Sequence, residues 1–123
     1  MNPIVAWDNV EQTRIRVTIS KLESLQQLKK ITQMLSAIVG EVAHPVDTLI
    51  IIKSAHMPEG FLHTLFNIER HVAKNRHRTM LVTNNTMFFE ITRSFLLGYM
   101  PNEHIRNVHL FETEEEAYEF YTT

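Results

Sequence analysis

The sequence predicts an α/β fold in which a mixed, mostly parallel five-stranded sheet is covered by helices. Short runs rich in β-branched residues alternate along the chain with segments whose apolar residues recur at helical spacing. Such alternation is typical of parallel strands joined by right-handed crossovers. The chain has 123 residues, 44% of them hydrophobic, which suits a single domain over residues 1–123 with one core. The expected order of elements is ββαβαβαβα.

The first two strands are expected to form a hairpin. Residues 4–7 read IVAW, and residues 13–19 read TRIRVTI, in which apolar and polar side chains alternate as in a half-buried strand. The five residues between them are short enough for a hairpin connection. An antiparallel pair with one solvated face would accommodate Arg14 and Arg16.

The first helix is expected to begin after Ser24, because Ser24 and Gln27 have the spacing of a capping box. Apolar residues then recur at helical spacing as far as Gly40 or Ala43, and Pro45 prevents continuation of the helix.

The third strand is expected over 47–53, DTLIIIK, which does not alternate and should therefore be buried on both faces. A second helix over 60–75 follows, and a fourth strand over 79–83. Pro58 suits the start of that helix because it lacks the backbone donor that would be unpaired there. Glu59 would meet the positive end of the helix dipole.

A third helix is expected to be capped by Asn84 or Asn85 and to end at Gly98, before Pro101. Its apolar residues exceed what one helix face can bury. We expect a helix deep in the core, and the alternative is a partly exposed patch that binds another chain. The residues expected to face inward are Met87, Phe88, Ile91, Phe95 and Leu96.

The chain closes with a fifth strand over 107–111 and a final helix. Thr113 and Glu116 form a second capping-box pattern, and acidic residues fill the first turn of the helix. The strand residues expected to be buried are Ile50, Ile52, Leu81 and Val108.

The composition excludes several classes of function. The chain has no cysteine, which rules out disulfides, thiol nucleophiles and thiolate metal ligands. Its formal net charge of -2 argues against nucleic acid as a partner. No signal peptide is visible, and no apolar run approaches the roughly 20 residues of a membrane helix. We therefore expect a cytoplasmic protein without a membrane span.

No cofactor or metal is expected. The glycine-rich nucleotide-binding motifs are absent, and the seven histidines show no HExxH or H-x-x-x-H spacing. Ser54 and His56 could form a nucleophile and base, but two positions apart is a poor arrangement, and no acidic residue obviously orients the ring. No catalytic residue is therefore predicted.

The candidate site lies where the third and fourth strands end, because ligands of open α/β sheets bind outside the carboxyl ends of the strands. Both of these ends are polar and both precede a helix. The expected partner-binding or ligand-binding residues are Ser54, His56, Glu59, Thr83, Asn84, Asn85 and Thr86.

Four segments carry a family resemblance: VDTLIIIK at 46–53, the helix start near PEG at 58–60, RTMLVTNN at 78–85 and VHLFETEEEAYEF at 108–120. In this order they resemble the STAS domain, the fold of bacterial anti-sigma-factor antagonists of the SpoIIAA type. The chain is still more similar to the divergent SpoIIAA-like group of small bacterial proteins.

The resemblance implies a non-catalytic regulatory domain that binds a protein partner, such as an anti-sigma-type kinase. Family members are phosphorylated on a D-S-[ST]-G turn. If Gly60 is matched to the glycine of that turn, this chain reads Met57-Pro58-Glu59-Gly60, without the aspartate and both hydroxyls. A phosphorylation switch is therefore not expected at this turn.

Two questions remain open from the sequence. The alternative function is a small-ligand-binding protein or small enzyme with a pocket at the same strand ends. A concave pocket with convergent polar groups would favour that alternative, and a flat face with exposed aliphatic residues would favour a protein partner. A homodimer is also expected, because the apolar surplus of the third helix and Trp7 would be hidden by self-pairing.

Overall fold

The computed structural model describes residues 4–22, 24–53, 59–64, 75–99 and 108–121, and the structural statements below concern these residues. Of the second helix expected over 60–75, residues 60–64 and 75 are described, and residues 61–64 are helical. The other elements are β1 (Ile4–Trp7), β2 (Arg14–Ile19), α1 (Leu25–Val39), β3 (Val46–Ile52), β4 (Arg76–Thr83), α3 (Thr86–Tyr99), β5 (Val108–Phe111) and α4 (Glu114–Tyr121). The expected α/β class is confirmed.

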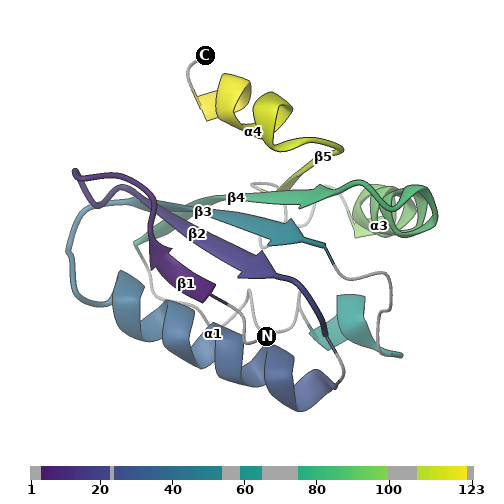
Figure 1. Ribbon diagram of the computed structural model, residues 1–123, viewed down its shortest axis with the longest axis horizontal. Coiled ribbons are helices and arrows are strands. Elements are labelled where there is room, and N and C mark those ends of the chain that lie inside the picture. The colour runs from purple at the N-terminus through teal and green to yellow at the C-terminus, as the bar shows by residue number, and fades with distance from the viewer. Residues whose placement is uncertain (1–3, 23, 54–58, 65–74, 100–107, 122–123) are drawn as a thin grey trace.

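The five strands form one sheet in chain order, β1-β2-β3-β4-β5 (Figure 1). β1 pairs antiparallel with β2, and every other pair is parallel. The register aligns Val17, Ile50 and Leu81 across the three central strands. The sheet is therefore mixed and mostly parallel, with the hairpin as its antiparallel edge, as expected.

The two faces of the sheet are covered by different helices. On one face, Val17, Ile50 and Leu81 belong to a core cluster shared with α1, Phe61 and α3. On the other face, a smaller cluster forms around Leu49, Ile51, Met80 and Val82 with Ala117 of α4. Figure 1 shows α1 below the sheet and α4 above it. β3 is buried on both faces, which explains why its sequence does not alternate.

Side chains at three helix starts satisfy backbone donors. Ser24 and Gln27 form the predicted capping box of α1. The side-chain oxygen of Asn85 accepts from the Phe88 N–H at 3.0 Å, so Asn85 caps α3. Thr113 accepts from the backbone N–H of Glu116 at 3.2 Å at the start of α4. These contacts fix where the chain enters each helix.

α4 is fastened to the hairpin by a polar network. The Arg16 guanidinium donates to Glu114 at 2.6 Å and to the Tyr118 hydroxyl at 2.9 Å. The Tyr118 hydroxyl donates in turn to Asp8 at 2.9 Å, and Arg14 donates to the same Asp8 oxygen at 2.7 Å. The two arginines of β2 are thus bound by the closing helix rather than left on a solvated face.

A third arginine, Arg78 of β4, lies near the same helix. Arg78 donates to Asp47 at 2.8 Å, and its guanidinium lies 5.2 Å from the ring centre of Phe120. The strand β4 begins at Arg76, earlier than the expected residue 79. Arg76, His77 and Arg78 are therefore part of the sheet, and Asp47 on the neighbouring strand pairs with Arg78.

The phase of α3 differs from the expected one. Met87 and Ile91 were expected to face inward, but their side chains are 74% and 52% exposed. Phe88 and Leu96 are buried as predicted, Phe95 is half-buried, and Thr92 is buried although it was not expected to face inward. Burial of Thr92 is possible because its hydroxyl donates to the Phe88 carbonyl at 2.8 Å. This phase turns Met87 and Ile91 outward, so the prediction of a deeply buried helix is wrong.

Two smaller expectations are corrected. Gly98 does not end α3, which continues to Tyr99. Among the described glycines, the positive φ typical of a glycine after a helix occurs at Gly60 instead, where φ is 81°. Ile50, Ile52 and Leu81 are buried as predicted, whereas Val108 is only half-buried. The reason is that β5 lies at the end of the strand order, with β4 as its one neighbour.

No helix in the described part of the chain is long and apolar enough to cross a membrane.

Candidate functional site

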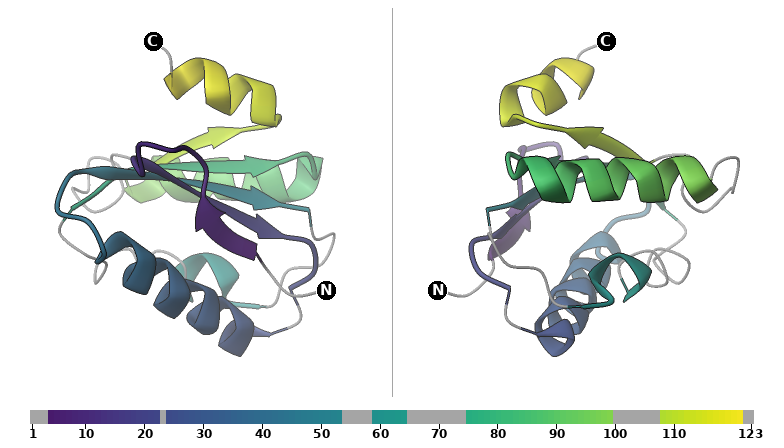
Figure 2. Two further views of the ribbon diagram at one scale, coloured as in Figure 1. Left: turned by 60° about the vertical axis from the view of Figure 1, so that its left-hand side comes forward. Right: turned by 90° about the vertical axis from the view of Figure 1, so that its right-hand side faces the viewer.

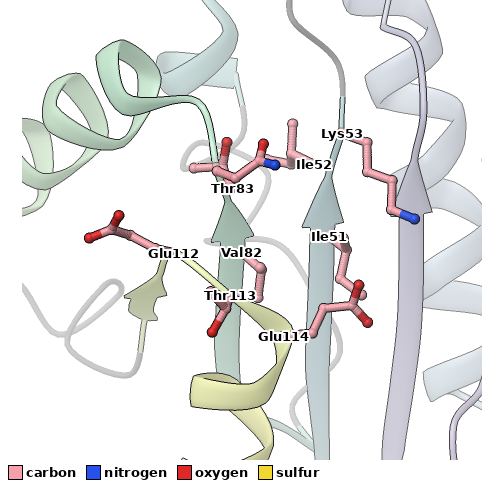
Figure 3. Close-up of a pocket in the computed structure, with 9 residues that line it drawn as sticks. Ile51, Ile52, Lys53, Val82, Thr83, Glu112, Thr113 and Glu114 are labelled. Carbon is pink, nitrogen blue, oxygen red and sulfur yellow. The ribbon is translucent and has the colours of Figure 1, made fainter.

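A pocket of about 400 Å³ lies at the carboxyl ends of β3 and β4, where α4 begins. Its floor consists of Ile51, Ile52 and Val82, which are aliphatic residues at the ends of the two central strands. Figure 3 shows the first turn of α4 passing over these strand ends. The pocket therefore occupies the edge of the sheet at which the sequence placed the site.

The rim of the pocket is polar. It is formed by Lys53, Thr83, Asn84, Glu112, Thr113 and Glu114. The Lys53, Asn84 and Glu112 side chains are exposed, and among the described residues neither Lys53 nor Glu112 has an ion-pair partner. In Figure 3 the Lys53 amine points toward the β2 side of the pocket and the Glu112 carboxylate points away from the floor. One positive and one negative charge are thus available at opposite sides of the opening.

Local structure fixes the backbone on the β3 and β4 side of the opening. The Lys53 N–H donates to the Ile19 carbonyl at 2.8 Å, which extends the pairing of β2 and β3 by one residue. The Thr83 side chain is buried, and its hydroxyl accepts from the Asn85 N–H at 3.3 Å. Asn84 is held between these two residues with its own side chain exposed.

The α4 side of the opening is also fixed. The Thr113 hydroxyl accepts from the Glu116 N–H and donates to the Glu116 carboxylate at 3.1 Å. Glu114, the first residue of α4, forms an ion pair with Arg16. Burial opposes the charge of Arg16, but hydrogen bonds to Glu114 and Tyr118 outweigh it and raise the pKa of Arg16. The Arg16 guanidinium therefore remains charged, and its hydrogen bond to Glu114 keeps the first turn of α4 in place.

The predicted site residues have different outcomes. Thr83 and Asn84 line the pocket. Asn85 uses its side chain to cap α3, and Thr86 is the exposed first residue of that helix; neither lines the pocket. Glu59 is exposed and also lies outside the pocket lining. Ser54 and His56 lie outside the described residues.

Sequence reasoning missed the contribution of the C-terminal segment. Glu112, Thr113 and Glu114 line the pocket, although none of them was among the predicted site residues. The available signal was the parallel alternation itself. A fifth parallel strand ends at the same edge as β3 and β4, so the residues after it belong to the same site.

A second hollow, of about 280 Å³, lies between the helical turn 61–64 and α3. It is largely apolar. The rings of Phe61 and Phe88 meet edge to face at 5.5 Å, and those of His63 and Phe95 do so at the same distance. The full lining is Gly60, Phe61, Leu62, His63, Phe88, Ile91 and Phe95.

The strand-end pocket combines an aliphatic floor with charged and hydroxyl groups at its opening. Its described lining contains no histidine, serine or cysteine that could act as a nucleophile or its base. The described residues also contain no group of three or more histidines, aspartates or glutamates placed to hold a metal ion. What the pocket offers is an aliphatic floor, two free charges and an amide at the opening.

No protein-family model, no curated protein and no solved structure matches this chain.

Proposed function

We propose that the protein is a non-catalytic regulatory domain of the STAS-like, SpoIIAA-like kind that binds a protein partner at the carboxyl edge of its sheet. The observation that carries the proposal is the pocket of about 400 Å³ at the ends of β3 and β4, whose rim residues Lys53, Asn84 and Glu112 are exposed. A partner would insert a side chain over Ile51 and Val82 and meet the two free charges at the opening.

The openness of the pocket favours a protein partner over a small molecule. Pockets for small molecules bury most of the surface of their ligand. Here four of the six rim residues are exposed. An exposed rim suits a larger partner surface that inserts one segment into the pocket and covers the rim as well. We expect that partner to be a cytoplasmic regulator, such as an anti-sigma-type kinase, in line with the family resemblance.

The turn before Gly60 supports a regulatory domain without a phosphorylation switch. Glu59 is exposed directly before Gly60, whose φ of 81° is a conformation that side chains with a Cβ rarely adopt. Glu59 carries a fixed negative charge at the place where the family carries a reversible phosphate. The domain would then remain in one binding state.

The test is capture of the partner from lysate of the source cells, followed by mass spectrometry. Asn84→Arg places a long cation in the opening and should abolish capture. Gln33→Arg makes the same change at an exposed position of α1 and should leave capture intact. Equal capture by both variants would rule out the strand-end pocket as the binding site.

A small organic ligand is the second candidate, because the pocket volume falls within the range of about 300–1,000 Å³ that is usual for such sites. Native mass spectrometry of the protein purified under mild conditions distinguishes the two. A bound small molecule that Asn84→Arg removes and Gln33→Arg retains would favour this candidate.

A further inference from the structure

The outward face of α3 carries a stripe with two large and two small residues. Met87, Ile91, Ser94 and Gly98 follow one another at intervals of four, three and four positions, so they lie along one side of the helix. All four are exposed, Met87 to 74% and Ile91 to 52%. The right-hand view of Figure 2 shows α3 across the near side of the molecule, with no drawn helix or strand in front of it.

The packing within the chain does not explain the composition of this stripe. A Cβ added to Gly98 would meet no atom within 4 Å, so the fold itself leaves room for a side chain there. Glycine inside a helix costs stability relative to alanine. A glycine with free space around it, on a line with two exposed large apolar residues, indicates a close approach by something outside the chain.

We propose that this stripe is the contact of an isologous homodimer in which two α3 helices pack antiparallel about a two-fold axis near Thr92 and Arg93. The axis places Met87 against Gly98 of the second copy and Ile91 against its Ser94. Each large residue then meets a small one, which lets the helices approach closely. The inference is independent of the proposed function, since the stripe and the strand-end pocket have no residue in common.

The charged residues beside the stripe are complementary to the same residues of a second copy. Glu90 and Arg93 form an ion pair of 2.6 Å within one copy, and their side chains are 52% and 57% exposed. A two-fold axis perpendicular to both helices keeps the same flank of each helix on the same side of the interface. Glu90 of each copy therefore lies beside Arg93 of the other, and four charges alternate in sign along that flank.

The opposite flank of the stripe is apolar. The hollow of about 280 Å³ begins there, because Ile91 and Phe95 belong both to α3 and to its lining. In the antiparallel arrangement, Ile91 of the second copy lies over this hollow and buries it. A second copy thus accounts for the two large and two small residues of the stripe, for both charges and for the hollow.

Charge reversal provides the test. Glu90→Arg alone and Arg93→Glu alone each place like charges together across the axis, so sedimentation velocity should show roughly tenfold weaker self-association for either variant. An equal mixture of the two variants should form a heterodimer as tight as the wild-type dimer, because every cross-axis pair is then of opposite sign. Wild-type protein that is monomeric at high micromolar concentration, or a mixture that fails to associate, would overturn the proposal.

A second comparison separates the interface from a general loss of apolar surface. Ile91→Glu should weaken the dimer by more than about tenfold, since a buried apolar contact becomes charged. Met34→Glu makes the same kind of change at a 46% exposed residue of α1 and should leave the dimer unchanged. Circular dichroism confirms that both variants are folded. Equal weakening by both, or a dimer that survives Ile91→Glu, contradicts the assignment.

Discussion

The hydroxyls of two tyrosines in α4 lie in different surroundings, which determine their hydrogen bonding and their pKa values. The Tyr118 hydroxyl donates to Asp8 and accepts from Arg16. Burial and the hydrogen bond to Asp8 raise the pKa of Tyr118, and Arg16 acts in the opposite direction. The Tyr121 hydroxyl is buried without a hydrogen-bond partner among the described residues, and burial raises the pKa of Tyr121 above its usual range. Its ring still contributes, because Arg14 lies 4.6 Å from the ring centre.

Tyr118→Phe should lower the free energy of unfolding by about 1 kcal/mol, because it removes one hydrogen bond to each of two charged groups. Tyr121→Phe is the matched change and should be neutral or stabilising, since the lost hydroxyl has no partner to leave unpaired among the described residues. Urea denaturation measures both. A greater loss for Tyr121→Phe than for Tyr118→Phe would contradict this account of the network.

Gly98 allows a prediction at the same scale. Gly98→Ala should raise the stability of the monomer by roughly 0.5–1 kcal/mol, because alanine is the better helix former and the added Cβ meets no atom within 4 Å. Thermal unfolding at a concentration below that of self-association measures the effect. A destabilised monomer would show that the glycine is required by the fold of the single chain.

Among the elements, the strands and helix starts could be predicted from the sequence more fully than the helix faces. Ile15, Val17 and Ile19 alternate with polar residues, and all three are buried as the alternation indicates. α3 was harder, because it is apolar on nearly every side and several phases would bury similar residues. The burial of Thr92 distinguishes the observed phase of α3 from the expected one. This burial depends on a hydrogen bond from the Thr92 hydroxyl to the backbone of the same helix, which no sequence pattern indicates.

The unit formed by β5 and α4 should loosen in mild acid. The ring of His109 lies 4.5 Å from that of Phe120. Burial lowers the pKa of His109 below 6.5, Arg78 lowers it further, and Asp47 partly opposes this effect. The folded state therefore favours the neutral ring. Its contribution to stability is complete above pH 6.5 and is lost as the pH falls through the lowered pKa.

The urea midpoint should consequently fall between about pH 7 and pH 5, and His109→Gln should flatten that dependence. Asp47 affects stability over a lower range of pH. Burial opposes its ionisation, but hydrogen bonds from Arg78 outweigh burial and lower the pKa of Asp47 below 3.8, so its contribution is lost only in stronger acid. An unchanged slope in His109→Gln would assign the mild-acid effect to another group.

For the molecule as a whole, the strand order follows the chain order and places the carboxyl ends of β3, β4 and β5 at one edge. The location of the candidate site could be predicted from this rule, and Thr83 and Asn84 were identified by it. Glu112, Thr113 and Glu114 could not be identified in the same way. Their position depends on α4 turning back over the second face of the sheet, which is a tertiary contact made by Ala117 and the network around Tyr118.

The central strand supports both faces, so it should dominate global stability. Ile51→Ala and Ile52→Ala remove side chains that are 3% and 2% exposed, on opposite faces, and each should cost about 2–5 kcal/mol. Val10→Ala, at a position that is 96% exposed, should change stability by less than about 0.5 kcal/mol. Denaturation monitored by two spectroscopic probes checks the values. A loss confined to one probe would show that the two faces unfold separately.

The docking of α4 has a consequence for the protein during its synthesis. Tyr118 and Asp8 lie 110 positions apart, and α4 follows every strand of the sheet along the chain. Among the described elements, α4 is the helix that covers the strand residues Leu49, Ile51, Met80 and Val82, and they lack this cover until the ribosome has delivered it. A nascent chain would present this strip to chaperones, and a message truncated before Glu114 would yield a product marked for proteolysis by the same strip. The cover that α4 provides for this face is therefore completed only after all five strands of the sheet have been synthesised.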